Sequence, residues 1–181
     1  MAFLPTCLPA AVSLASCPDG SPGISNIYYC QKSDIASTTV TSNEITAFTM
    51  ESGKIFFEIE TDDQVSGLSE ASADIRYASK SVATLTAQVP GLSTVIQTQL
   101  LSVKNCCELV FVLKLNSGLY KVMGYDIDYA AQTTTYKNCQ LNVLNWDSRT
   151  GADDDYATTT IGAVCTTIGL APVFNGTLTL S

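Results

Sequence analysis

Alternation of apolar and polar residues is the dominant pattern along this chain. Successive side chains of a strand point to opposite faces, so a period of two predicts strands with one buried face. The alternation is clear at residues 54–60, KIFFEIE, and similar strand-forming runs occupy residues 27–30 and 44–50. Residues 51–53, ESG, are turn formers. They predict a hairpin between segments 44–50 and 54–60.

Residues 62–89 form a long polar segment that is rich in serine, threonine and alanine. Its alternation is most visible in SVATLTAQV at residues 81–89. Two strands joined near the middle of this segment would exceed the usual length of about five or six residues. The sequence therefore predicts a protruding hairpin at 62–89. An uncovered flat strand invites pairing with another chain, so we expect the hairpin to contact a neighbouring subunit.

The spacing of the apolar residues changes after Pro90 and Gly91. Apolar residues then recur at spacings of three and four, which predicts one amphipathic helix over about residues 92–104. Ser93 is available to cap its first turn. The apolar positions of this helix are Leu92, Val95, Ile96, Leu100 and Val103.

The run ELVFVLKL at residues 108–115 is too short for such a helix and is rich in branched and aromatic residues, so it predicts a central strand. Residues 116–118, NSG, predict a turn into a second hairpin strand at 119–124. Residues 149–155 are expected to form a loop. Further strands are predicted at 138–145, 156–162 and 163–168. The fold class is therefore mainly β, a β-sandwich or barrel with one flanking α-helix.

A cluster of turn formers at residues 18–25, PDGSPGIS, predicts a boundary between an N-terminal arm, residues 1–25, and a single domain at 26–181. The first 17 residues resemble a secretory signal in their apolar content, but they lack a basic start and contain two prolines. They favour an uncleaved arm over a signal peptide. Such an apolar arm is expected to pack on an adjacent subunit. No stretch is long and apolar enough to predict a membrane span.

The composition narrows the range of functions. Only 14% of residues are charged and 46% are hydrophobic, which predicts that much of the surface contacts other protein. The net charge of −8 and the lack of a basic cluster argue against binding nucleic acid through its phosphates. The chain has no histidine, the side chain that most often moves protons near neutral pH. Since no nucleophile or paired-carboxylate signature occurs either, we expect no enzymatic activity and no cofactor.

The seven cysteines include no CxxC pair, and their odd number fits neither a disulfide framework nor a zinc site. We predict reduced, buried cysteines that act as small apolar residues in a reducing compartment. Cys106 and Cys107 are adjacent, a geometry that suits packing better than a redox pair. Residues 153–155, DDD, lack the spacing of a calcium loop and are expected to form a solvated acidic loop. No metal site is therefore expected.

Several segments together resemble phage structural proteins, most closely the tail tube-like proteins of phages that infect Bacteroidetes. The resemblance rests on the order of these segments, which cover most of residues 17–174. After an early Cys17 they are GISNIYYC at 23–30, EITAFTM at 44–50, KIFFEIE at 54–60, the helix at 92–104, LVFVLKLNSGLYKVMGYD at 109–126, SRTGADDD at 148–155 and IGLAPVF at 168–174.

The resemblance implies the tube fold shared by long-tailed phages, contractile tails and related injection machines. In that fold a β-sandwich or barrel with a flanking helix assembles into stacked hexameric rings. It implies a virion structural protein, a tail tube subunit assembled in the cytoplasm of the bacterial host. Its partners would be further copies of itself and other tail or connector proteins, while DNA passes through the channel without specific binding.

Two alternatives to a tail tube subunit stay open from the sequence. The first is another virion component of the same fold, such as a tail terminator, a connector or a capsid-decorating protein. The second is a secreted adhesion module, to which the signal-like first 17 residues would correspond.

A channel that conducts DNA must not hold it, so negative charge is expected on its wall. In the resembled fold a sheet lines the channel, and four carboxylates lie on or beside the strand predicted at 54–60. These lumen-facing candidates are Glu58, Glu60, Asp62 and Asp63. The spacing of two places Glu58 and Glu60 on one strand face, and Phe57 and Ile59 on the other, toward the core.

Overall fold

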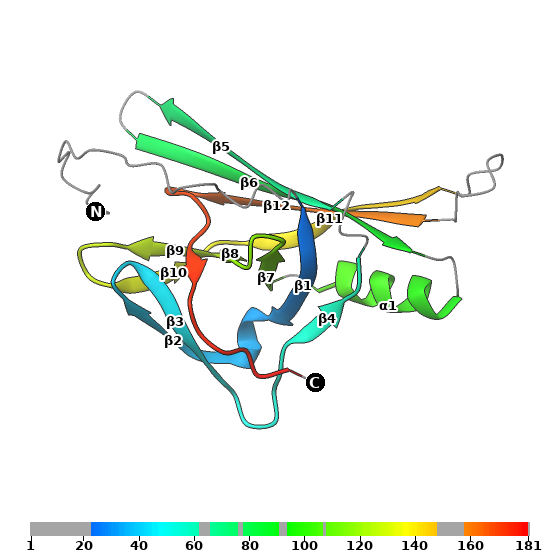
Figure 1. Ribbon diagram of the computed structural model, residues 1–181, viewed down its shortest axis with the longest axis horizontal. Helices are drawn as coiled ribbons and strands as arrows, with labels where there is room; N and C mark the ends of the chain where they lie inside the picture. The colour runs from blue at the N-terminus through cyan, green and yellow to red at the C-terminus, as the bar shows by residue number, and fades with distance from the viewer. Residues whose placement is uncertain are drawn as a thin grey trace.

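The computed structural model describes residues 23–61, 66–75, 78–90, 94–106, 108–147 and 158–180. Side chains are described for these ranges except at residues 73–75, 78–79, 94–97, 143–144 and 146–147. This part of the chain contains thirteen β-strands and one α-helix, so the prediction of a mainly β fold with one flanking helix is confirmed (Figure 1).

Seven strands form the large sheet. Their order is β2 (Ile35–Thr41), β3 (Glu44–Met50), β13 (Val173–Phe174), β8 (Tyr120–Met123), β7 (Leu109–Leu115), β1 (Ile24–Gln31) and β4 (Phe57–Ile59). β13 pairs in parallel with β3 and antiparallel with β8. The large sheet therefore joins segments from both ends of the described chain.

A second sheet of four strands lies over the large sheet (Figure 1). Its order is β11 (Cys139–Asp147), β12 (Thr158–Thr167), β6 (Ala78–Pro90) and β5 (Gly67–Ile75). The helix α1 (Thr94–Lys104) lies beneath one end of this sheet and contacts β11. A two-stranded sheet, β9 (Tyr125–Asp128) with β10 (Thr133–Tyr136), lies beside β2.

β7 is buried on both faces, as its continuous apolar run predicts. Leu109, Phe111 and Leu113 point into a core between the two main sheets, which we call the inter-sheet core. Val110 and Val112 point to the other side of the large sheet, into a second core that β2, β3 and β9 help to enclose. All five side chains are fully buried. β7 therefore contributes side chains to both cores.

The predicted pairing of segments 44–50 and 54–60 is wrong. β3 pairs with β2, and β4 pairs with β1 at the far edge of the large sheet. The reason is the two-residue turn at Ser42 and Asn43, whose φ values of 54° and 69° match the type I′ turn that closes tight hairpins. Between β3 and β4, Lys54 makes an ion pair with Asp34 at 2.9 Å.

Two other strand predictions have different outcomes. The turn at residues 116–118 does join β7 to β8, so this hairpin is confirmed. Segments 156–162 and 163–168 were expected to be two strands, but Thr158–Thr167 is one continuous strand, β12. Gly162 stays within β12, paired with Thr86 of β6, and the irregularity that a strand glycine often marks lies opposite it in β11, as a register shift between Leu141 and Val143.

The segment at 62–89 contains the β5–β6 hairpin. Strand pairing, a hydrogen bond and an ion pair connect this hairpin to the rest of the fold. β6 pairs with β12 from residue 81 to residue 90, so only the start of β6 extends past β12. On β5, the Glu70 carboxylate accepts a hydrogen bond from the Ala171 amide at 2.5 Å. Lys121 of β8 lies 3.3 Å from the same carboxylate and donates to the Ala171 carbonyl at 2.9 Å. This cluster ties the edge of the four-stranded sheet to the large sheet.

Two ionisable groups in the second core are expected to make the fold less stable at alkaline pH. Burial raises the pKa of Cys30 from 9.0 to about 12, with Asp34 adding to the effect. Burial likewise raises the pKa of Tyr125 from 10.0 to about 12, with Cys30 adding to it. From about pH 9 upward the unfolded chain loses these protons while the folded chain keeps them, so the free energy of unfolding falls as pH rises towards 12.

This prediction is checked by urea unfolding at a series of pH values from 8 to 11.5. Tyr125→Phe should reduce the slope of the alkaline loss, because the variant has one ionisable group fewer. A free energy of unfolding that stays constant between pH 9 and pH 11.5 would contradict the expected result.

Candidate functional site

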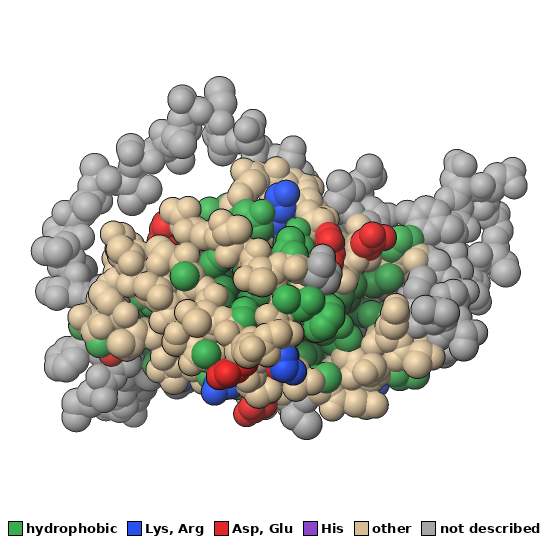
Figure 2. Space-filling view, turned by 90° about the horizontal axis from the view of Figure 1, so that it is seen from below, with side chains coloured by type: hydrophobic (Ala, Val, Ile, Leu, Met, Phe, Trp, Pro, Cys, Tyr) green, Lys and Arg blue, Asp and Glu red, His purple; other side chains and the backbone are tan. Residues whose placement is uncertain are grey.

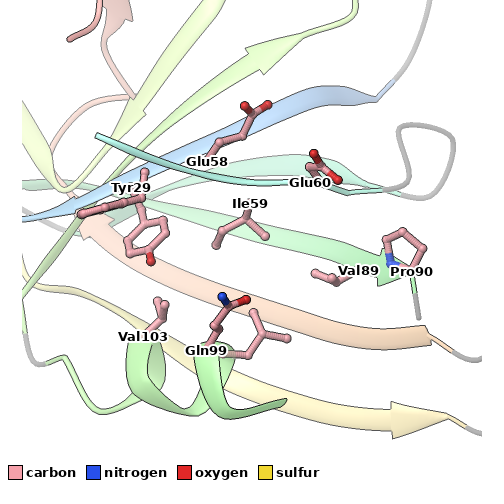
Figure 3. A pocket seen from close by; sticks show the side chains of 10 residues that line it. Tyr29, Glu58, Ile59, Glu60, Val89, Pro90, Gln99 and Val103 are labelled. Carbon is pink, nitrogen blue, oxygen red and sulfur yellow. The ribbon is translucent and has the colours of Figure 1, made fainter. Parts of the chain in front are cut away.

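A cleft of about 430 Å³ opens between β4, α1 and the end of β6 (Figure 3). It lies at the margin of the inter-sheet core, to which its lining residues Ile59, Val89 and Leu100 belong. Apolar side chains form its floor, while polar atoms contribute nearly as much of the lining surface as apolar atoms do. The lining residues are Tyr29, Phe57, Glu58, Ile59, Glu60, Val89, Pro90, Gln99, Leu100 and Val103.

Three elements position the walls of this cleft. β4 is held against β1 by a short antiparallel register in which Phe57 lies opposite Tyr29 and Ile59 opposite Ile27. The helix presents Leu100 and Val103, three residues apart and therefore on one helical face. β6 contributes its last residues, and Pro90 suits this position because proline cannot continue a ladder of backbone hydrogen bonds.

The floor of the cleft is buried and its mouth is open. Ile59, Val89, Leu100 and Val103 are each less than a tenth exposed, whereas Phe57 is 46% exposed. The Phe57 ring contacts that of Tyr29, with centroids 5.8 Å apart. On the face shown in Figure 2, hydrophobic side chains gather and are open to solvent.

The expectation that Phe57 points into the core is therefore wrong, whereas the same expectation for Ile59 is confirmed. The two residues are on the same face of β4. Ile59 is covered by the inter-sheet core, but Phe57 lies at the mouth of the cleft, where it contacts Tyr29 and nearly half of it stays exposed.

The predicted lumen-facing residues fall into two groups. Glu58 and Glu60 are both exposed, and their carboxylates lie on the side of β4 opposite Ile59 (Figure 3). Asn26 donates a hydrogen bond to the Glu58 carboxylate at 2.5 Å. Asp62 and Asp63 lie outside the described residues.

The tyrosines near β4 are held in their neutral form. Burial is the main cause that raises the pKa of Tyr28, and the negative charge of Glu58 adds to it. Burial likewise raises the pKa of Tyr29, with a smaller contribution from Cys106. Tyr29 therefore offers the cleft an uncharged hydroxyl near neutral pH.

The chemistry of the cleft suits contact with protein. Its buried surface consists of aliphatic and aromatic groups, and its two carboxylates point towards solvent. Among the described residues, no group of three Cys, Asp or Glu side chains is placed to hold a metal ion. An apolar side chain or an extended segment is the kind of occupant that this lining would stabilise.

Two strands of the described chain lie at sheet edges. β4 is the last strand of the large sheet and borders the cleft, although Phe56, the residue before it, forms a parallel bridge with Leu180. β5, which does not line the cleft, pairs with β6 alone within the described chain. The opposite edge of the large sheet, β2, is partly covered by β10 through a hydrogen bond between Thr38 and Thr134. Asn43 and Gln132 reinforce this contact by donating to each other, at 3.1 and 2.7 Å.

Sequence reasoning did not identify this cleft, although its parts were visible in the sequence. The helix periodicity correctly selected Leu100 and Val103 as apolar-face positions. The signal for β4 was misleading, because a seven-residue alternating run predicts a longer strand than the three residues that form ladder pairs. The partnership of Tyr29 with Phe57 depends on which strands are neighbours, and no local pattern encodes that.

No helix in the described part of the chain has both the length and the apolar character needed to cross a membrane.

Comparison with known proteins does not identify a family. No family model matches the sequence, and neither a curated protein nor a solved structure matches the chain.

Proposed function

We propose that this protein is a virion structural protein, a tail tube subunit that assembles into stacked hexameric rings around a DNA-conducting channel. One observation carries the proposal more than any other: β4, the last strand of the large sheet, lies beside a cleft with an apolar floor whose mouth exposes Phe57. An exposed edge next to an apolar groove is a surface on which a second chain gains both backbone hydrogen bonds and buried area.

The occupant that we propose for this cleft is a neighbouring copy of the same chain. Self-assembly is favoured by the composition, since only 14% of the residues are charged. It is also favoured by the second free edge, β5, which is nine residues long and contains exposed small polar side chains such as Ser69 and Ser72. A ring needs two different contact surfaces on each subunit, because head-to-tail contacts are what close a ring.

The acidic side of β4 is consistent with a channel wall. Glu58 and Glu60 are exposed and point away from the floor of the cleft, so a neighbour that enters the cleft need not cover them. The net charge of −8 has the sign that keeps a phosphate backbone from adhering to the wall.

Negative-stain electron microscopy of the purified full chain, together with analytical ultracentrifugation, tests the proposal. Tubes or many-ringed stacks would support a major tube subunit, whereas single rings would favour the terminator or connector alternative. A chain that stays monomeric at all concentrations would overturn the assembly proposal. A mature N-terminus beginning at Cys17 in the native protein would favour the secreted adhesion module.

The charge of the channel wall gives a second test, which depends on the proposed function. In phage carrying Glu58→Lys and Glu60→Lys together, we expect intact tubes but slower DNA ejection, because the wall then attracts phosphate. The delay should grow at low ionic strength, where screening is weaker and the attraction reaches further, about 30 Å at 0.01 M salt against 10 Å at 0.1 M.

The matched control is the Glu58→Gln and Glu60→Gln pair, which removes the charge and keeps the side-chain length. This pair should eject DNA faster than the lysine pair at low salt, and the difference should shrink as the salt concentration rises. Equal ejection rates for the lysine pair and the natural chain in low salt would show that these two carboxylates do not face the channel.

A further inference from the structure

Two cysteines face each other in the four-stranded sheet. Cys139 of β11 and Cys165 of β12 are direct partners in the antiparallel register. Both are free thiols, and both are buried, with 0% and 1% of their surface exposed. Their burial confirms the expectation that they pack as small apolar residues. Their pairing was not expected, since 25 residues separate them in the sequence.

The backbone geometry indicates which kind of antiparallel pair they form. Residues opposite each other alternate between pairs that exchange both backbone hydrogen bonds and pairs that exchange none. The Cys139 amide donates to the Tyr136 hydroxyl at 3.4 Å, so it is directed away from a reciprocal bond with Cys165. A non-hydrogen-bonded pair has Cα atoms about 4.5 Å apart and its side chains close together. That separation lies within the range of about 4.4–6.8 Å found for disulfides.

The surroundings of the pair keep both sulfurs in place. The Cys165 thiol lies 3.8 Å from the Lys137 carbonyl, to which it donates. A hydrogen bond to Cys165, with burial, raises the pKa of Cys139 well above its usual value. The same hydrogen bond lowers the pKa of Cys165, so Cys165 is the easier of the two to ionise. Because both sulfurs are buried, a large reagent has little access to them without opening of the sheet. Cys139 is the first residue of β11 and follows an exposed residue, Asn138, so the pair lies at the end of the strand ladder and not in its middle.

We propose that Cys139 and Cys165 form a redox site that hydrogen peroxide converts into a disulfide between β11 and β12. One thiolate attacks peroxide, which breaks the O–O bond, releases hydroxide and leaves a sulfenic acid. The second thiolate attacks that sulfur, forms the Sγ–Sγ bond and releases the sulfenic oxygen as water once it is protonated. Two thiols and one peroxide thus yield one disulfide and two waters.

The bond would close a loop that contains the whole β11–β12 connection. A closed loop of this size lowers the conformational entropy of the unfolded chain. The native strand register needs little adjustment to accept the disulfide bond. Oxidation should therefore raise the unfolding temperature of the chain by about 5–10 °C. This inference stands independently of the proposed assembly function, because it concerns one sheet within a single subunit.

The test uses the full chain, fully reduced and then freed of reductant, with hydrogen peroxide as the probe. Peptide mapping under non-reducing conditions should find Cys139 linked to Cys165, with the loss of two hydrogen atoms. The rise in unfolding temperature should be reversed by a dithiol. Cys165→Ala should lose both the linked peptide and the rise.

The control is Cys30→Ala. Cys30 is just as buried, but it lies opposite Val110 of β7 and has no thiol across the strand pair. This variant should keep the linked peptide and the temperature rise on oxidation. Peptide mapping of the natural chain decides the outcome even if a variant folds poorly. If peroxide leaves both thiols unlinked, or converts either one to sulfinic or sulfonic acid instead, the proposal is overturned.

Discussion

Replacing Phe111 with alanine is expected to lower the free energy of unfolding by about 3–5 kcal/mol, the usual cost of removing a fully buried aromatic ring. Phe111 is at the centre of β7, between Tyr29 on β1 and Met123 on β8, and none of its surface is exposed. The two main sheets and α1 enclose the inter-sheet core on several sides, so the cavity cannot close without moving a whole element.

Urea unfolding followed by circular dichroism measures this loss. Phe57→Ala is the matched control, because it removes the same side chain from a site where nearly half of the ring is in solvent. This control should cost less than about 1 kcal/mol. Similar losses for the two variants would show that Phe111 is not the central residue of the core.

Phe57→Asp is expected to abolish assembly while leaving the monomer folded, if the cleft binds a neighbouring subunit as proposed. An aromatic side chain at the centre of a contact can account for about 2–4 kcal/mol of binding. A carboxylate in its place also brings an unpaired charge into an apolar cleft. Together these effects correspond to a loss of at least 100-fold in the association constant.

Sedimentation of the variant at the concentration where the natural chain assembles gives the readout. Leu119→Asp is the control, since Leu119 is 42% exposed but lies at the β7–β8 turn, outside the cleft. We expect it to assemble normally. If Phe57→Asp assembles as well as the natural chain, the cleft is not the contact surface, although another surface could still form rings. Failure of both variants would show that the loss of assembly is not specific to a charge in this cleft, which contradicts the expected result.

The elements that sequence could predict here are those whose signal is local. The apolar run of β7 requires burial on both faces, and the structure places a core on each side of it. The three-and-four spacing predicted α1 to within two residues at its start. Gly118 has a φ of +84°, which is why the turn after β7 needs a glycine.

The features that sequence could not predict depend on strand neighbours. β1 shifts register between Ile24 and Asn26, so Ile24 and Ile27 both enter the inter-sheet core although they are three residues apart. Strict alternation predicts opposite faces for such a pair, and a bulge is what reverses it. β13 has two ladder residues, far too few for a periodic signal.

The sequence was sufficient to predict which side of β4 carries the acidic residues, but not that a cleft forms beside it. Alternation correctly separated Glu58 from Ile59, which are on opposite sides of β4. The cleft itself exists because β4 comes last in the large sheet and α1 covers the adjoining core only in part, and both are consequences of tertiary packing.

The place of β13 has a consequence for how the chain folds during synthesis. β13 lies between β3 and β8, and in the described chain it supplies the backbone ladder that connects the β2–β3 hairpin to the other strands of the large sheet. A ribosome makes β2 and β3 more than 120 residues before it makes Val173 and Phe174. Until those two residues emerge, the β2–β3 hairpin has a free edge towards β8. Nascent chains should therefore be most vulnerable to proteolysis and mispairing at β3 late in translation, and a chaperone that protects this edge would raise the yield of folded protein.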